Sequence, residues 1–338
     1  MFRMKQAVTL CVALVLGLGC LTSGHARAQD KWVVYDGYDG PGKGKHIVFV
    51  TGDEEYRSEE AMPLMGKILA KHHGFKCTVL FAVNEETGEI DPETLDNIPG
   101  LEALETADLM VLFTRFRELP DEQMKYIIDY TDSGRPIIGL RTATHAFMYR
   151  KNRDSQYAKY GRGTDEFEGG YGRQVLGETW VDHHGDHGSE STRGLIAEGM
   201  EDHPLVRGCE DVWAASDVYT VRKLHGDSKP VIMGQVLQTM EPDSPPNTDK
   251  ELMPVAWIKS YTGAKGKKAR VFTTTMAAAP DLVSEGLRRL LVNACYWCMG
   301  MEDQISGGAK VDIVGEFKPT FFGFGTFKKG VMPAEHKM

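Results

Sequence analysis

The stretch Pro136-Ile-Ile-Gly-Leu-Arg-Thr-Ala-Thr-His145 is the most informative part of this chain. It begins as an apolar run of the kind found in buried strands and changes abruptly to polar residues at Arg141. We expect a short helix to follow. In an α/β sheet, the carboxyl end of a strand opens on the crevice in which ligands bind, and the next helix presents unpaired N–H groups there. We therefore place a functional site at this junction.

The segments before this stretch alternate between strands and helices. We expect strands at 46–51, 77–83, 109–114 and 136–140, and helices at 58–73 and from 120 to near 134. The strands are apolar throughout, which is typical of a parallel sheet with helices on both faces. The first half of the chain therefore predicts an α/β fold with a mostly parallel central sheet.

The pattern changes in the second half of the chain. Residues 149–188 are polar and glycine-rich, and a loop of this length is usually functional. Strand-like segments follow at 193–197, 218–224, 230–237, 252–261 and 269–275, and a last helix spans 281–300. We divide the chain into a signal peptide at 1–28, an extended lead-in at 29–45, one domain at 46–302 and a C-terminal extension at 303–338. Residues 308–314 could add an edge strand.

The first 28 residues have the features of a secretory signal peptide. Arg3 and Lys5 precede an apolar run, and Ala26-Arg27-Ala28 is a small-x-small cleavage site. A membrane anchor is the alternative, but the run is short for a span. We therefore expect a secreted or periplasmic protein with no stable membrane span after cleavage. Cleavage changes the formal net charge from −9 to −12, which argues against nucleic acid as a partner and favours a small neutral or cationic ligand.

Four cysteines follow the predicted signal peptide, namely Cys77, Cys209, Cys295 and Cys298. An oxidising compartment permits disulfides. The Cys295-Tyr-Trp-Cys298 pair lies inside a predicted apolar helix, however, and no second pair accompanies it. We therefore favour buried core thiols over a structural disulfide, and a disulfide over a redox motif.

Dense polar groups follow three neighbouring strands of the predicted sheet. They are Asp53 and Glu54 after the first strand, Arg115 and Arg117 after the third, and Arg141, Thr142 and His145 after the fourth. Buried strands end in so many charges only where these charges pair or meet a ligand. The tip residues Glu55, Arg57 and Glu59 are set aside, because loop charges of this kind are often solvated.

Two interpretations of this cluster compete. In the structural one, Asp53 or Glu54 pairs with an arginine and seals the top of the sheet. In the functional one, Asp53 or Glu54 is the base and His145 or His184 is the acid. Arg115 and Arg141 then bind an anion or hydroxyls of the substrate. Arg117 and Thr142 are further candidates for substrate binding.

A second cluster is Trp180-Val-Asp182-His183-His184-Gly-Asp186-His187. Imidazoles and carboxylates suit zinc or a similar divalent metal, with His183 and His187 as candidate ligands. The spacing matches no closed zinc motif and lacks the helical placement of His-Glu-x-x-His. Three interpretations stay open: a polar loop that binds backbone and substrate hydroxyls, a metal site, or catalysis by one histidine, for which His184 is the candidate.

Asp217 and Tyr219 alternate along an extended segment, so their side chains are expected to face the same side. A carboxylate can accept protons from sugar hydroxyls while an aromatic ring stacks on the apolar face of the sugar. The pair therefore suits carbohydrate binding, and it suits a plain half-buried strand equally well.

The junction at Arg141 resembles the strand–elbow–helix of class I glutamine amidotransferases, whose pattern is roughly Pro-x-x-Gly-x-Cys-x-Gly-His. Arg141 stands where that family has its nucleophilic cysteine. A guanidinium is always protonated and cannot attack a carbonyl. We therefore expect this scaffold without amidotransferase activity.

Several motifs in their order resemble the trehalose-utilisation (ThuA-like) family. They lie at 46–55, 139–145, 177–184, 202–208, 217–219, 254–257, 269–275 and 293–300. The resemblance implies a flavodoxin-like three-layer sandwich of the class I glutamine amidotransferase type and a role in carbohydrate breakdown. It also implies a histidine near the elbow, which His145 matches, and a second one that His183 or His184 matches.

We interpret the chain as an exported protein that acts on a sugar or keto-sugar by proton transfer. No activated cysteine and no Ser–His–Asp order is visible, so nucleophilic catalysis is disfavoured. The alternatives are a non-catalytic carbohydrate-binding or scaffold protein and a metal-dependent hydrolase. The main interpretation requires Asp53, Arg115 and His145 to meet in one pocket under the histidine-bearing loop.

Overall fold

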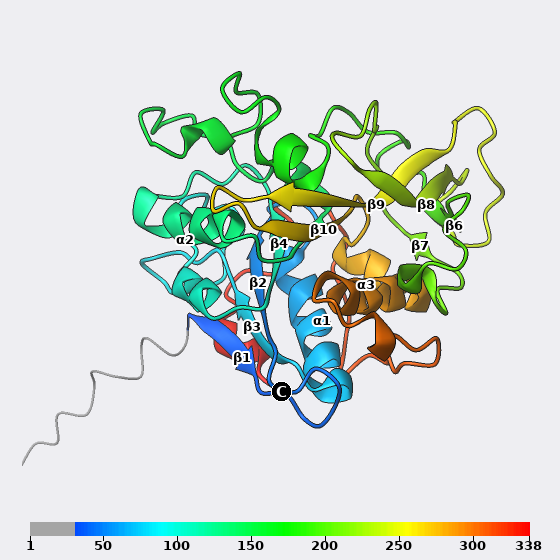
Figure 1. The fold of residues 1–338 in the computed structure, drawn as a ribbon, viewed down its shortest axis with the longest axis horizontal. Helices are drawn as coiled ribbons and strands as arrows, with labels where there is room; N and C mark the ends of the chain where they lie inside the picture. The colour runs from blue at the N-terminus through cyan, green and yellow to red at the C-terminus, as the bar shows by residue number, and fades with distance from the viewer. Residues whose placement is uncertain (1–30) are drawn as a thin grey trace, which may run out of the picture.

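The computed structural model describes residues 31–338, so the predicted signal peptide lies outside the described residues. One ten-stranded sheet runs through the molecule in the order β1-β3-β2-β4-β5-β10-β9-β8-β6-β7 (Figure 1). The strands are β1 Trp32–Tyr35, β2 His46–Gly52, β3 Lys76–Leu80, β4 Leu109–Thr114, β5 Ile137–Leu140, β6 Thr192–Ile196, β7 Trp213–Ala214, β8 Lys229–Val236, β9 Met253–Thr262 and β10 Lys268–Thr274. The α-helices of residues 31–338 are α1 Ser58–His73, α2 Asp121–Asp132 and α3 Glu285–Cys298.

The predicted elements of the first half form where the apolar patterns place them. Strands β2 and β4 are buried along almost their whole length, because helices cover both faces of this part of the sheet. Helix α1 occupies the predicted range and ends at Gly74, whose φ of 80° lies in the left-handed region that glycine adopts without steric cost.

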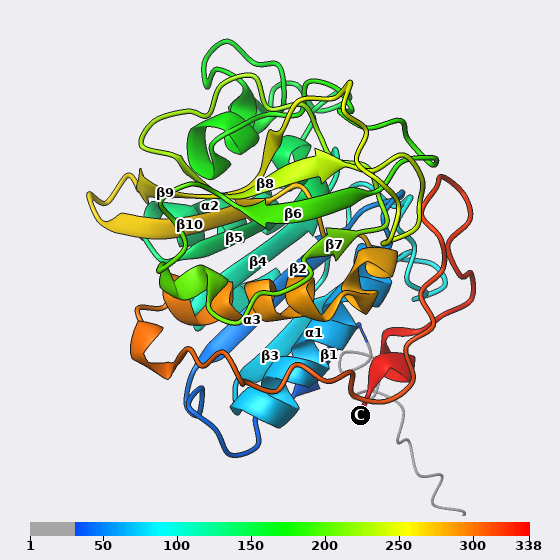
Figure 2. The same ribbon diagram turned by 90° about the vertical axis from the view of Figure 1, so that its right-hand side faces the viewer.

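The helices divide the core into two layers. Helices α1 and α3 pack on one face of the sheet around Ile68 and Leu290 (Figure 2). Helix α2 packs on the other face through Met124 and Ile127. Burial of these apolar side chains contributes about 25 cal/mol per Å² of surface removed from water, which makes the two layers the main source of stability.

The predicted flavodoxin-like three-layer sandwich with a mostly parallel sheet is wrong. Strands β3, β2, β4, β5 and β10 pair in parallel, but the pairs β1–β3, β10–β9, β9–β8, β8–β6 and β6–β7 are antiparallel. The sheet is therefore mixed and richer in strands than that fold. The cause is visible in the connections: residues 263–267 join β9 to β10 directly, and a link this short can join only antiparallel strands.

Three local expectations also differ from the structure. Residues 218–224 contain no strand and contribute a single bridge, between His183 and Tyr219. Residues 308–314 add no edge strand. The last helix begins later than predicted, at Glu285, because Ser284 caps it by accepting from the Leu287 N–H and a separate 3-10 turn at Ala279–Val283 precedes it.

The four cysteines of residues 31–338 are part of the core. Cys77, Cys209, Cys295 and Cys298 are buried as free thiols. Burial raises the pKa of Cys295 to about 12, so this thiol stays protonated at neutral pH. No helix within 31–338 is long and apolar enough to cross a membrane.

The C-terminal extension runs along the outer side of α3 and α1 (Figure 2). Near its end, the Tyr35 hydroxyl donates to the His336 carbonyl at 2.7 Å, and the Val331 carbonyl accepts from the Ile90 N–H at 2.8 Å. These contacts hold the extension against β1 and β3 and bring residues 320–326 to the carboxyl end of β2.

Candidate functional site

The carboxyl ends of β2 and β5 are joined through Asp53, which is fully buried. Its Oδ1 accepts from the backbone N–H of Glu55 at 2.7 Å and of Tyr56 at 2.5 Å, and its Oδ2 accepts from the Thr142 hydroxyl. Both oxygens are therefore occupied by donors, and Asp53 fixes the turn after β2. Asp53 is thus held in the turn by three donors, in the position of a structural carboxylate more than in that of the predicted base.

Glu54 joins β2 to β4 through two arginines. Its Oε1 lies 2.5 Å from Arg115 Nη1, and its Oε2 lies 2.7 Å from Arg117 Nη2. Arg117 is fully buried and also donates to the carbonyls of Pro92 and Thr94, at 2.9 and 2.8 Å. Glu54 thus forms with Arg115 an ion pair of the structural interpretation, and Arg117 adds a second one. Arg117 is buried and has no surface to offer a substrate.

Arg141 is buried beneath the histidine-bearing loop in a strained conformation. Its φ is 46°, in the left-handed region that costs a residue with a side chain about 1–3 kcal/mol. Its Nη1 donates to the Thr275 carbonyl at 2.6 Å, and its guanidinium carbon lies 3.7 Å from the centre of the Tyr56 ring. Its Nη2 lies 3.7 Å from Asp217 Oδ1, and its Nε has no hydrogen-bond partner. Arg141 therefore places a permanent positive charge next to Asp217.

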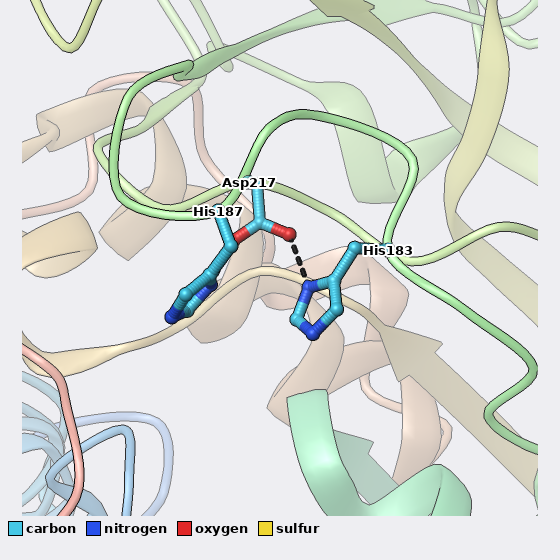
Figure 3. A group of neighbouring side chains, drawn as sticks. All are labelled: His183, His187 and Asp217. Carbon is cyan, nitrogen blue, oxygen red and sulfur yellow. Dashed lines mark hydrogen bonds and ion pairs between the residues drawn. The ribbon is translucent and has the colours of Figure 1, made fainter.

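Asp217 is the centre of the site and holds two histidines (Figure 3). Its Oδ2 lies 2.5 Å from His183 Nδ1, and its Oδ1 lies 2.8 Å from His187 Nδ1. Burial alone would raise the pKa of Asp217, but the two histidine hydrogen bonds and the Arg141 charge lower it well below its usual range. An ionised carboxylate only accepts, so each Nδ1 must carry the proton. Each neutral ring therefore has its lone pair on Nε2.

His187 has an acidic neighbour at its Nε2 atom. The hydrogen bond to Asp217 raises the pKa of His187, although its partial burial opposes this. Glu55 Oε1 lies 3.4 Å from His187 Nε2 and favours the protonated ring. The pKa of Glu55 is raised by burial and by the nearby Asp53 carboxylate. Two side chains that can each hold a proton, His187 and Glu55, thus lie side by side. Glu55 was not among the residues expected to contribute to the site.

His145 is placed as a neutral support. Its Nδ1 lies 3.1 Å from the Thr144 hydroxyl, and its ring packs 4.9 Å from Phe116 and 5.8 Å from Tyr219 between ring centres. Burial, followed by the positive charges of nearby arginines, lowers the pKa of His145 well below the usual value. A ring that resists protonation in this way is poorly suited to the predicted role of general acid.

The Tyr219 ring packs between His183 and Arg141. Its ring centre lies 5.7 Å from that of His183 and 4.9 Å from the Arg141 guanidinium carbon. Tyr219 is buried, so it supports both side chains and exposes no face for a sugar to stack on. His184, one residue from His183, is directed elsewhere: its Nε2 lies 2.7 Å from the Glu251 carbonyl, on the connection between β8 and β9.

The same group of residues has the composition of a metal site. One ligand atom from each of His183, His187 and Asp217 lies within 4.8 Å of the others. Two imidazoles and a carboxylate suit zinc and related ions. A metal on this carboxylate would have to displace an Nδ1 proton, however, and it would lie close to the charge of Arg141. The arrangement as it stands is that of a hydrogen-bonded acid–base group.

A surface groove of about 420 Å³ lies elsewhere, on β9 and β10, and includes Asp227, Lys259 and Trp297. Burial lowers the pKa of Lys259 to about 8, but its amine donates to the Gln174 carbonyl at 2.7 Å. Asp227 is bound to Ser260. The groove therefore holds no pair of free groups that could exchange a proton, and the histidine cluster is the better candidate.

The structure thus brings together most of the residues that the sequence singled out, in changed roles. Asp217 and Tyr219 contact the histidines directly. Arg141, His145 and Arg115 lie one contact further away, against Asp217, Tyr219 and Glu55 respectively. Sequence reasoning missed the C-terminal segment, in which Phe322 lies 5.3 Å from the His187 ring. The cluster of three phenylalanines at 321–324 was the available signal.

Comparisons with known proteins give structural neighbours only. No protein-family model matches the sequence, and no curated protein does. A structure described as a thua-like protein from Bacteroides uniformis shares 13% identity and covers 77% of this chain and 93% of its own, with a TM-score of 0.46. A second, from Parabacteroides merdae, shares 13% identity and covers 83% and 98%, with a TM-score of 0.45. Both neighbours carry the ThuA-like name.

Proposed function

We propose that this ThuA-like protein catalyses proton transfer on a sugar or keto-sugar. One observation carries the proposal: the buried Asp217 accepts the Nδ1 protons of His183 and His187 together. The two side chains are 31% and 37% exposed, so both rings are partly open to solvent. A pair of histidines oriented by one carboxylate has the parts of a general acid–base catalyst.

The Glu55 carboxylate near His187 Nε2 is the basis on which we assign the two roles. His187, beside Glu55 and with a raised pKa, holds a proton and donates it to a substrate oxygen. His183 is the base, and its neutral Nε2 takes a proton from the carbon next to a sugar carbonyl. The electron pair of that C–H bond moves into the carbonyl, whose oxygen receives the proton from His187. The product is an enediol, from which isomerisation or β-elimination of a glycosidic oxygen can follow.

Arg141 acts as a positioning residue in this proposal. Its charge keeps Asp217 ionised, and an ionised Asp217 keeps both histidines in the Nδ1–H form. We expect no amidotransferase activity, because Arg141 stands where the resembled pattern has its nucleophilic cysteine. Burial also keeps the described thiols protonated.

Deuterium exchange tests the proposal directly. A panel of 3-keto-glycosides in D₂O is followed by proton NMR, which records loss of the C–H signal next to the carbonyl. Wild-type protein should catalyse the exchange, and the variants Asp217→Asn and His183→Gln should lose it. His184→Gln is the matched control and should retain it, since that ring is bound to the Glu251 carbonyl. Unchanged exchange in Asp217→Asn, or no exchange with any sugar by wild type, would overturn the proposal.

A metal-dependent hydrolase is the second candidate, because three ligand atoms lie within 4.8 Å of one another. A divalent ion there would polarise a carbonyl or activate a water. Elemental analysis of the purified protein distinguishes the two candidates. About one zinc, iron or manganese ion per chain, lost in a His187→Gln variant, would favour the metal, and sub-stoichiometric amounts would remove this candidate.

Export and a carbohydrate partner belong to the proposal as well. The basic, apolar and small-residue pattern of residues 1–28 supports export to the periplasm or the medium. The mature protein should then begin at Gln29, which the intact mass of the secreted protein measures. The acidic net charge of the chain supports a small neutral ligand over nucleic acid.

A further inference from the structure

The C-terminal segment 320–326 is fixed against the rim of the histidine site. The backbone N–H of Gly323 donates to the Glu55 carbonyl at 2.8 Å, and Arg57 Nη2 donates to the Gly323 carbonyl at 2.5 Å. Thr320 donates from its N–H to Glu60 at 2.8 Å. These anchors come from the turn after β2 and from the first turn of α1. The segment is therefore a built part of the site's edge.

One phenylalanine of the segment joins it to the catalytic histidine. Phe322 is buried, and its ring centre lies 5.3 Å from that of His187 and 5.5 Å from that of Tyr56. Phe321 stacks on Phe322 at 4.2 Å but is itself 53% exposed. The exposed Phe321 ring is thus connected to His187 through the Phe322 ring, on a segment that hydrogen bonds fix in place.

A second exposed ring, Phe324, is connected to His187 through Arg115 and Glu55. Phe324 is 57% exposed, and the Arg115 guanidinium carbon lies 4.9 Å from its ring centre. Arg115 Nε in turn lies 3.6 Å from Glu55 Oε2, and the other oxygen of Glu55 faces His187. The guanidinium therefore lies between the second ring and the acid–base pair.

We propose that Phe321, Phe324 and Arg115 form a subsite for a second sugar ring of the substrate. The inference rests on the proposed function and extends it to substrate length: the protein takes a disaccharide or other glycoside whose reacting ring lies at the histidines. An exposed aromatic face binds the apolar C–H face of a pyranose ring, and the guanidinium N–H groups donate to its hydroxyls. The fixed backbone lowers the entropy cost of presenting these rings.

Substrate length gives the test. Michaelis constants and turnover are measured for a 3-keto-disaccharide and for the matching 3-keto-monosaccharide. Phe321→Ala and Phe324→Ala should each raise KM for the disaccharide about three- to tenfold, the range of one aromatic contact. Turnover should stay the same, as should KM for the monosaccharide. Phe324→Trp should restore disaccharide binding, because it returns an aromatic face.

Ile313→Ala is the matched control, since Ile313 is an exposed apolar residue of the same extension outside the anchored segment. It should change neither constant. Equal losses for both sugars in Phe324→Ala would indicate a purely structural role and overturn the subsite, as would unchanged disaccharide KM in both phenylalanine variants. If wild-type protein acts on neither sugar, the proposed function itself fails, which the phenylalanine variants alone cannot produce.

Discussion

Replacement of Glu59 by glutamine should remove part of the pH dependence of the free energy of unfolding. Glu59 lies in the first turn of α1, is only 7% exposed, and neither of its carboxylate oxygens has a hydrogen-bond partner. Burial raises its pKa to about 8, from an ordinary value of 4.5, and the residue's own backbone N–H and the nearby Arg57 charge offset only part of this. The fold therefore holds a carboxyl group that stays protonated at neutral pH.

The sign and size of the effect follow from proton linkage. Between pH 4.5 and about 8, the unfolded chain releases the Glu59 proton while the folded chain keeps it, so stability falls as pH rises through this window. At 1.36 kcal/mol for each pH unit, the loss approaches about 5 kcal/mol, and water entry or local relaxation would reduce it. Glu59→Gln removes the titration. Relative to wild type, the variant should gain stability steadily between pH 5 and pH 8.

Urea unfolding of wild type and Glu59→Gln at several pH values measures this difference. Glu122→Gln is the control, because Glu122 occupies the first turn of α2 and is exposed. The control should follow the wild-type curve at every pH. Parallel curves for wild type and Glu59→Gln would show that the carboxyl group ionises freely in the folded state, and the argument from burial would then be refuted.

Other replacements probe the site itself. Thr142→Val removes a donor from the buried Asp53 and should cost about 1–3 kcal/mol in urea unfolding; an unchanged midpoint would contradict the link between the carboxyl ends of β2 and β5. Arg141→Ala leaves Asp217 without its buried countercharge and should cost about 3–5 kcal/mol besides activity, a loss that calorimetry would fail to find if Arg141 were dispensable to the fold. Because its folded pKa is raised, His187 stabilises the fold fully below pH 6.5 and loses this effect as pH rises through the folded pKa. The stability difference between wild type and His187→Gln should narrow over that range, and a constant difference would exclude the linkage.

Local pattern was sufficient for β2 to β5 with α1 and α2, but it did not indicate β1, an antiparallel edge strand inside the expected lead-in. The apolar runs of β2 and β4 and the end of α1 at Gly74 are set by residues close in sequence. The second half was different, because a short apolar run does not specify which strand becomes its neighbour. The hairpin at 263–267 makes β9 antiparallel to β10, where the pattern predicted a mostly parallel sheet.

The candidate site was predicted in composition but not in roles. The sequence indicated that strand ends and the histidine loop would converge, and Asp217 and His183 do meet. It did not separate His183 from His184, because neighbouring residues of an extended segment point to opposite sides and a shift of one residue exchanges them. It also could not place Phe322 beside His187, since that contact joins positions far apart in the chain.

Nitrogen-15 NMR of the histidine side chains tests the central claim most directly. If Asp217 holds both rings, the neutral forms of His183 and His187 should carry their proton on Nδ1 and leave Nε2 free. Asp217→Asn should shift both rings toward the Nε2–H form that free histidine prefers. An Nε2–H form of either ring in wild-type protein, or spectra that the Asp217→Asn replacement leaves unchanged, would contradict the account.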